Sequence, residues 1–271
     1  MKMDHAKHPG DSPFGGISGV PVLLYHGIGR ENTRSRADRF TVSVDQFGLQ
    51  LRAVSEIAST VKLDQLQCSA ALGPGQEKVA LTFDDGLESD FRVVFPLLQK
   101  HGFAAHFFVN TASVGLPGYM NWQQIRELHR AGMQIGSHGH RHICLSIASE
   151  TVVASELARS REILENELQS SIRWFSAPYG LVTARVLRVA RQSGYTGICT
   201  SRCWPASASS TVPRVAVCRQ TSIKEFRSLI LRKRLIYWRR NLAAAAKYVP
   251  RHILLRAQPS VLDVTVSRQA V

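Results

Sequence analysis

The amino-acid sequence predicts an α/β fold built on a parallel sheet. Short apolar runs, typical of buried strands, alternate along the chain with longer segments whose apolar residues recur at helical spacing. The runs are apolar at successive positions, as in parallel strands that are buried on both faces. The chain has 271 residues, 44% hydrophobic and 20% charged, which allows a large core and excludes a disordered or fibrous protein.

The expected strands each end at a glycine or at a polar residue that begins a loop. In chain order they are residues 20–29, 78–83, 104–109, 133–138, 172–180 (a strand and a turn) and 195–200. The expected helices are residues 43–59, 88–101, 121–132, 150–168 and 184–194. Asn121 and Gln124 form a predicted capping box, Gly102 and Gly132 are stop signals, and Pro96 is expected to split or delay the second helix.

The formal net charge of +14 is concentrated near the C-terminus, where residues 214–256 hold twelve Lys and Arg and the single acid Glu225. The five cysteines include no C-x-x-C pair, which predicts free thiols rather than disulfides or a cysteine-ligated zinc. Residues 1–19 lack the apolar run of a secretory signal, and no stretch of 18 apolar residues occurs. We therefore expect a cytoplasmic protein.

Polar residues follow four of the predicted strands. They are Tyr25 and His26, the run "DDG" at 84–86, the run "HGHRH" at 138–142, and the turn "SAPY" at 176–179. In parallel α/β folds, and above all in barrels, active residues gather where strands end and loops begin. Each motif alone has a structural interpretation, as a turn or a polar loop, but their common location favours one functional site on one rim.

The adjacent pair Asp84 and Asp85 can divide two tasks, because their side chains leave the backbone on opposite sides. One carboxylate can bind a cation while the other accepts a proton. Histidine nitrogens together with a carboxylate suit a divalent metal such as zinc, and three protein ligands leave a position open for water. A metal in such a site can activate water and polarise a carbonyl, so these residues favour a hydrolase.

These motifs, taken in order, resemble the polysaccharide deacetylase family (NodB-type, similar to carbohydrate esterase family 4). The resemblance rests on "LTFDDG", "AAHFFV", "IGSHGHRH", "FSAPYG", "SGYTGICTS" and "VPRVAV", and is strongest with the exopolysaccharide-cluster branch, whose members share a "P-V-L-x-Y-H" strand. It implies a distorted (β/α) barrel over residues 19–217. Residues 1–18 would be a flexible leader and residues 218–271 a basic helical extension.

The resemblance also implies roles for the site residues. Asp84 would be the catalytic base that takes a proton from a metal-bound water, the nucleophile. Asp85, His138 and His142 would hold the metal, which is expected to be zinc, with other divalent transition metals as alternatives. His140 is surplus to this set and is predicted to point away from it.

The "APYG" turn is expected to line the substrate groove through Ser176, Pro178 and Tyr179, with the Tyr179 backbone N–H helping to hold the oxyanion. Many members have an arginine where this chain has Ser176, and Arg214 is the candidate replacement, also counted among the substrate-binding residues.

Three further positions depart from the family pattern. Gln258 stands where a general-acid histidine is expected, so that role is assigned to His26, with a locally hydrogen-bonded His26 as the alternative. His106 replaces a usual Thr and is expected to pack, and Gly139 replaces a usual Ser or Thr.

The implied function is removal of N-acetyl groups from an amino-sugar oligosaccharide or polysaccharide in exopolysaccharide or envelope-glycan biosynthesis. Two alternatives remain open: a catalytically weak or silent relative that binds glycan, motivated by Ser176 and Gln258, and an amidohydrolase of a small non-sugar amide.

The basic tail predicts a helix over residues 222–248 that begins with the capping box of Ser222 and Glu225. One apolar stripe consists of Leu231, Leu235, Trp238 and Leu242, and a second of Phe226, Ile230 and Tyr237. Either one stripe packs on the barrel and the rest is solvated, or the helix lies on an anionic membrane surface. No nucleic-acid motif accompanies the charge, so we do not expect a nucleic-acid partner.

Overall fold

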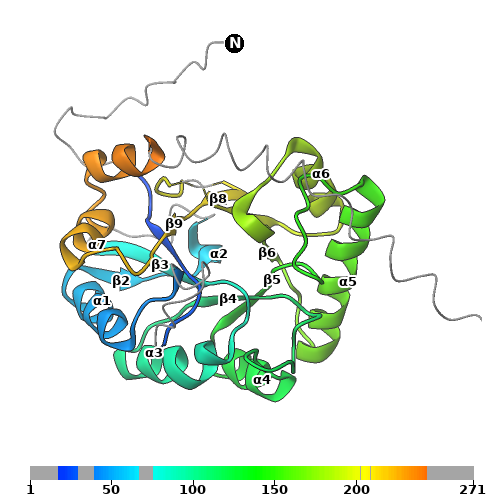
Figure 1. Cartoon of the computed structure of the whole chain (residues 1–271), viewed down its shortest axis with the longest axis horizontal. Helices are drawn as coiled ribbons and strands as arrows, with labels where there is room; N and C mark the ends of the chain where they lie inside the picture. The colour runs from blue at the N-terminus through cyan, green and yellow to red at the C-terminus, as the bar shows by residue number, and fades with distance from the viewer. Residues whose placement is uncertain (1–17, 30–39, 67–75, 202, 208, 243–271) are drawn as a thin grey trace, which may run out of the picture.

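Nine parallel strands form a sheet that curls into a nearly closed barrel, with helices around its outside (Figure 1). This architecture is that of a computed structural model, which describes residues 18–29, 40–66, 76–201, 203–207 and 209–242. The strand order is β8-β7-β6-β5-β4-β3-β1-β9, with β2 paired to β3. The strands are β1 (Val22–Tyr25), β2 (Ala58–Thr60), β3 (Glu77–Phe83), β4 (His106–Val109), β5 (Gln134–Ser137), β6 (Trp174–Ser176), β7 (Gly197–Thr200), β8 (Thr211–Pro213) and β9 (Val215–Ala216).

All six predicted strands are present, and the predicted α/β barrel is confirmed. Three strands were not expected from the sequence: β2, β8 and β9. Each has only two or three residues, too few for a periodic pattern, and β8 also contains Pro213, which cannot donate to a ladder.

The segment 211–216 joins the two edges of the sheet. Strand β8 pairs with β7 and strand β9 pairs with β1, and Arg214 alone separates the two strands. The Arg214 N–H donates to the Thr200 carbonyl at 3.0 Å, and the Val217 N–H donates to the Leu24 carbonyl at 2.7 Å. One short stretch of chain thus closes the barrel and holds Arg214 in its wall.

The helical layer follows the sequence closely. Its elements are α1 (Val44–Ile57), α2 (Leu63–Leu66), the π-helical turn η3 (Asp90–Val94), α3 (Phe95–His101), α4 (Trp122–Arg130), α5 (Glu150–Leu168), the 3₁₀ turn η4 (Pro178–Gly180), α6 (Ala184–Gln192) and α7 (Ile223–Ile230). The predicted split at Pro96 appears as the π-helical turn before α3, and the Asn121–Gln124 capping box is formed. Gly102 ends α3 with a φ of 67°.

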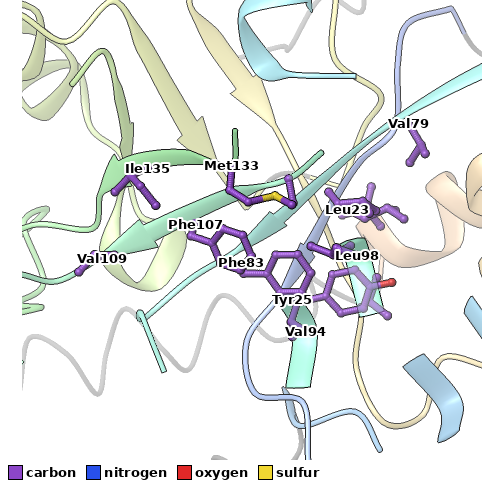
Figure 2. Packing of buried hydrophobic residues seen from close by; sticks show 14 of the residues in the cluster. Leu23, Tyr25, Val79, Phe83, Val94, Leu98, Phe107, Val109, Met133 and Ile135 are labelled. Carbon is purple, nitrogen blue, oxygen red and sulfur yellow. The ribbon is translucent and has the colours of Figure 1, made fainter. Parts of the chain in front are cut away.

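The main core lies between the sheet and the helices. Every second residue of a strand points outward from the barrel and packs against the helical layer. Figure 2 shows Tyr25, Phe83 and Phe107 in a row, one aromatic ring from each of β1, β3 and β4. Their successive ring centroids lie 5.2 and 5.0 Å apart in stacked geometry. Inside the barrel a second cluster, which includes Phe108 and Trp174, fills the space with side chains. The barrel therefore has a packed interior, and its loops at the carboxyl ends of the strands are left to carry a site.

The basic segment after Val217 is not an appended extension over its described part. Helix α7 packs against α1 and buries Phe226 and Ile230 completely, so it belongs to the helical layer of the barrel. A continuous helix over residues 222–248 is wrong, because α7 ends at Ile230, Arg232 takes a left-handed φ of 51°, and a second helical segment covers 234–242.

Some expectations fall on residues that the structure does not describe: Gln258, Cys68 and the leader 1–18 apart from residue 18. The other four cysteines are free thiols. Among the described helices, none is both long enough and apolar enough to cross a bilayer.

Candidate active site

The carboxyl ends of β3 and β5 bring the predicted metal-binding residues together. Asp85 follows β3, and His138 and His142 lie in the loop after β5. One donor atom from each of the three lies within 4.8 Å of the other two, and no other such group of acids, histidines and cysteines occurs among the described residues. The convergence expected from strand ends is thus what the fold produces.

The distances in this triad match those that a tetrahedral cation needs. Nε2 of His138 and Nε2 of His142 each lie 3.3 Å from the same oxygen, Oδ1 of Asp85. Bonds of about 2.0 Å at tetrahedral angles place ligand atoms about 3.3 Å apart. The three residues therefore fit a zinc-sized divalent ion without rearrangement of the Asp85–histidine pairs.

The hydrogen bond at the far side of the His138 ring sets its tautomer. Nδ1 of His138 lies 2.8 Å from the Ser176 carbonyl oxygen, which can only accept, so Nδ1 carries the proton. In the neutral form of the ring, which is the form that binds a metal, Nε2 then carries the free lone pair and faces Asp85. A backbone carbonyl that orients a ligating histidine in this way is common around protein-bound metals.

The backbone of the site adopts conformations that L-residues rarely use. Asp85 and His142 have φ values of 82° and 57°, and Gly139 has a φ of 80°. The left-handed turn at Gly139 gives a physical reason for glycine at this position, since a side chain there would be strained. Strain at non-glycine residues occurs where surrounding structure fixes the chain, typically at functional sites.

His140 points away from the triad, as predicted. Its Nδ1 forms a hydrogen bond of 2.8 Å with the hydroxyl of Thr111, and it is not among the converging donors.

Asp84 lies below the rim in a buried polar cluster. Arg214 is 1% exposed and forms a bidentate pair with Asp84, with Nη1 2.7 Å from Oδ1 and Nη2 2.8 Å from Oδ2. The hydroxyl of Ser176 donates to Asp84 Oδ2 at 2.9 Å and accepts from Arg214 Nη2 at 2.7 Å. Oδ2 of Asp84 is also 3.9 Å from Nε2 of His138, so the carboxylate borders the triad.

The charges around Asp84 determine its protonation. Burial by itself raises the pKa of Asp84, but the positive charge of Arg214, then that of His138, and the Arg214 hydrogen bonds outweigh burial and lower it below its ordinary value. Burial likewise opposes the charged form of His138, whereas Asp84 and Asp85 raise its pKa. Asp84 is therefore an anion at neutral pH, as a base must be.

The structure corrects the predicted substrate contacts of Ser176 and Arg214. Both are fully buried under Asp84, so they position the carboxylate rather than touch substrate. Arg214, which lies between β8 and β9, contacts Asp84 directly, as is expected of a replacement for the missing motif arginine. In the turn after β6, Pro178 is buried, whereas Tyr179 is 47% exposed with a φ of 61° and its ring centroid lies 5.0 Å from that of His142.

His26 lies close enough to this cluster to feel its charges. Burial lowers the pKa of His26, and Asp85 and Asp84 act in the opposite direction, with a net lowering. Its buried Nδ1 has no hydrogen-bond partner within the described part of the chain. His106 packs inside the barrel instead, with its ring centroid 5.6 Å from that of Phe108, and burial lowers its pKa to about 3.

Two positioning residues were missed in the sequence. Asn110 donates from Nδ2 to the Asp85 carbonyl at 2.8 Å and so supports the strained backbone of that residue. Glu156, buried on α5, accepts from the Arg141 N–H at 2.8 Å and holds the loop between the two histidines. Asn110 directly follows a predicted strand, so the strand-end rule offered a signal. For Glu156 the only signal in the sequence was the presence of an acidic residue on the inward face of a predicted helix.

The structure predicts different metal affinities for two neighbouring histidine variants. His138→Ala removes a converging donor and is expected to lose the metal, whereas His140→Ala leaves all three donors and is expected to bind as wild type does. Zinc titration with a competing chelator measures the difference. Equal affinity of the two variants would contradict the assignment of His138.

Comparison with known proteins agrees with this geometry. Residues 72–198 match the family model described as polysaccharide deacetylase. The chain is 26% identical over 194 residues to the putative polysaccharide deacetylase YxkH of Bacillus subtilis, covering 70% of this chain and 66% of that protein. It is 25% identical over 199 residues to a poly-beta-1,6-N-acetyl-D-glucosamine N-deacetylase of Staphylococcus aureus, covering 64% and 69%.

Among solved structures, the Streptococcus pyogenes deacetylase PplD in complex with acetate has the same fold. The TM-score is 0.72 at 23% sequence identity, and the superposition covers 79% of this chain and 98% of that one. These similar proteins are named as deacetylases, which are hydrolases. Over residues 72–198 the chain therefore carries a polysaccharide deacetylase domain.

Proposed function

We propose that the protein removes N-acetyl groups from an amino-sugar oligosaccharide or polysaccharide, with a divalent metal, zinc, held by Asp85, His138 and His142. We assign it to exopolysaccharide or envelope-glycan biosynthesis in the cytoplasm, at the inner face of the membrane. The substrate class is supported by the family and by the Staphylococcus aureus relative, which is named for a poly-N-acetylglucosamine substrate. The biosynthetic role is supported by the similarity to the exopolysaccharide-cluster branch.

One observation carries this proposal: a buried anionic carboxylate borders a triad of metal-type donors. Asp84 lies beside His138 but does not belong to the triad, so it remains available to accept a proton. A single carboxylate in this place could either bind the metal or accept the proton, but not both. The pair of adjacent aspartates, directed differently by the strained φ of Asp85, provides both.

The residues of the chain divide the reaction as follows. A divalent cation in the triad would supply an activated water and polarise the acetyl carbonyl. Asp84, kept ionised by Arg214, accepts the proton of the attacking water. The backbone N–H of Tyr179 donates to the oxyanion that develops on the carbonyl oxygen. His26 protonates the departing amine, and acetate and a free amino sugar result.

Acetate release from N-acetylglucosamine oligomers tests the function. We expect release by the metal-loaded protein, loss of release after removal of the metal by chelation, and recovery after zinc is restored. Tight oligomer binding without acetate release would indicate the silent glycan-binding alternative. Release from simple acetamides but not from any acetylated sugar would indicate the non-sugar amidohydrolase.

The role of His26 predicts a change in the pH dependence. A general acid must be protonated, and the pKa of His26 is lowered by burial, so its contribution falls as pH rises through a value below the usual 6.5 or so. His26→Gln is expected to lower kcat by about 10²-fold and to flatten that alkaline limb. A pH profile of kcat for both proteins measures this. An unchanged pH profile would exclude His26 as the general acid and would indicate a packing role against Phe40.

A further inference from the structure

The helical segment 234–242 and the residues just before it expose a row of large apolar side chains. The exposed fractions are 38% for Leu231, 69% for Leu235, 59% for Trp238 and 51% for Leu242. From Leu235 to Leu242 the spacing of three and four residues is that of one helix face, and Leu231 lies just before the segment, at the end of α7. These four residues, called the apolar stripe below, face solvent rather than the barrel.

The opposite face of the same segment is fixed to the protein. Ile236 and Tyr237 are buried, and the Tyr237 hydroxyl donates to the Leu229 carbonyl at 2.8 Å. Arg240 donates to Glu225 at 2.8 Å and to the Ala216 carbonyl at 2.6 Å. The exposure of the apolar stripe is therefore a property of a docked helix, whose inner face already has its partners.

Basic residues around the stripe fall into two groups. Three of them serve the fold through ion pairs with acids of the barrel or of α7: Arg227 with Glu56, Arg232 with Glu77 and Arg240 with Glu225. The other three, Lys233, Arg234 and Arg239, are exposed and have no ion-pair partner among the described residues. Residues 226–242 contain no acid at all. Three free cations thus alternate with the apolar stripe on the outer surface.

We propose that the apolar stripe together with Lys233, Arg234 and Arg239 is a docking surface for an anionic lipid bilayer. Leucine and tryptophan side chains insert among acyl chains and headgroups, while lysine and arginine bind the anionic headgroups beside them. Nucleic acid would use the cations but would leave the leucines in water. An apolar protein partner would use the leucines but would have to bury three charges.

The orientation of the helix relates this surface to the active-site rim. Arg232 contacts the Gly19 carbonyl and Glu77, at the amino ends of β1 and β3, whereas Arg240 contacts the Ala216 carbonyl at the carboxyl end of β9. The segment therefore runs up the flank of the barrel toward the rim that carries Asp85. Docking on this flank holds the rim beside the bilayer surface, within reach of a saccharide attached to lipid.

Flotation of the full chain with vesicles tests the surface. We expect binding to phosphatidylcholine vesicles that contain phosphatidylglycerol and little binding to phosphatidylcholine alone. Replacing Lys233, Arg234 and Arg239 with Gln is expected to weaken binding roughly 100-fold, since each basic residue contributes about fivefold near an anionic surface. Leu235→Ser/Trp238→Ser is expected to abolish it. The matched controls are Arg52→Gln/Lys100→Gln/Arg130→Gln for the charges and Leu49→Ser/Leu116→Ser for the apolar residues. Both remove exposed residues elsewhere and are expected to bind as wild type does.

Fluorescence quenching by brominated lipids provides a second readout that does not depend on deacetylation. The wild type is expected to be quenched, and Trp238→Phe is expected to remove most of that quenching. The proposal is overturned if quenching is unchanged in Trp238→Phe, or if vesicle binding is equal for wild type and the triple Gln variant. It is also overturned if the stripe variants abolish dimer formation in solution and leave vesicle binding intact. Because none of these variants touches the active site, failure of the surface and failure of the catalytic proposal are distinguishable.

Discussion

Asp84→Asn is expected to lower the rate of acetate release by roughly 10²- to 10⁴-fold, the usual contribution of a general base. The carboxamide has nearly the same shape as the carboxylate but cannot accept the proton. The three metal donors are other residues, so the metal content is expected to stay at the wild-type level. Steady-state kinetics on an N-acetylglucosamine oligomer, with the metal content of each preparation measured, check both parts.

Asp85→Asn is the matched control for this variant. It alters the neighbouring carboxylate, and we expect it to lose metal and activity together, because Asp85 Oδ1 is the atom that both histidines face. Asp84→Asn is expected to separate the two properties. Loss of metal in Asp84→Asn, or wild-type activity with metal retained, would show that the two adjacent aspartates do not have the roles assigned here.

Local sequence patterns were sufficient for most of the barrel. Strand β3 is an apolar run followed by "DDG", and α4 carries its own capping box, so element and loop are both encoded within a few residues. Closure of the barrel by β8 and β9 was not predictable, because it depends on pairing between residues 23 and 215 rather than on any local period. The break in the helix at Arg232 was not predictable either, because the helical spacing of apolar residues continues through it. The break goes with tertiary contacts, namely the pairing of Arg232 with Glu77 and the burial of Tyr237.

The site likewise contains residues that the sequence could predict and contacts that it could not. Strand-end position and family resemblance together selected Asp85, His138 and His142, because all three lie directly after strands that the sequence shows plainly. The contact between Arg214 and Asp84 joins residues 130 positions apart and could only be proposed as a replacement for a missing arginine. That Ser176 and Arg214 are both buried against Asp84 depends on the register of β6, β7 and β8, which no local pattern reveals.

Arg214→Met is expected to destabilise the native state by about 3–5 kcal/mol, since removing one partner of a buried ion pair leaves the other charge unpaired. Arg214 and Asp84 are 1% and 2% exposed, so water cannot replace the lost contacts. Urea unfolding at neutral pH measures the loss. The double variant Asp84→Asn/Arg214→Met removes both charges and is expected to recover most of it, which a mere packing defect at residue 214 would not allow.

The pH dependence of this loss gives a second and more specific test. In the wild type the folded pKa of Asp84 is depressed, so the pair stabilises the protein above about pH 4, the unfolded pKa, and this contribution disappears as pH falls through the folded value. Without Arg214, burial dominates and the pKa of Asp84 rises. Protonation then favours the folded state, so the difference in stability between variant and wild type is expected to be largest at neutral pH and to shrink as the solution is acidified.

The activity of the variant is expected to be lost at a higher pH than that of the wild type on acidification, because Asp84 is protonated sooner. A stability difference that stays constant with pH would mean that Arg214 contributes by its volume alone, and that the ionisation of Asp84 is controlled elsewhere.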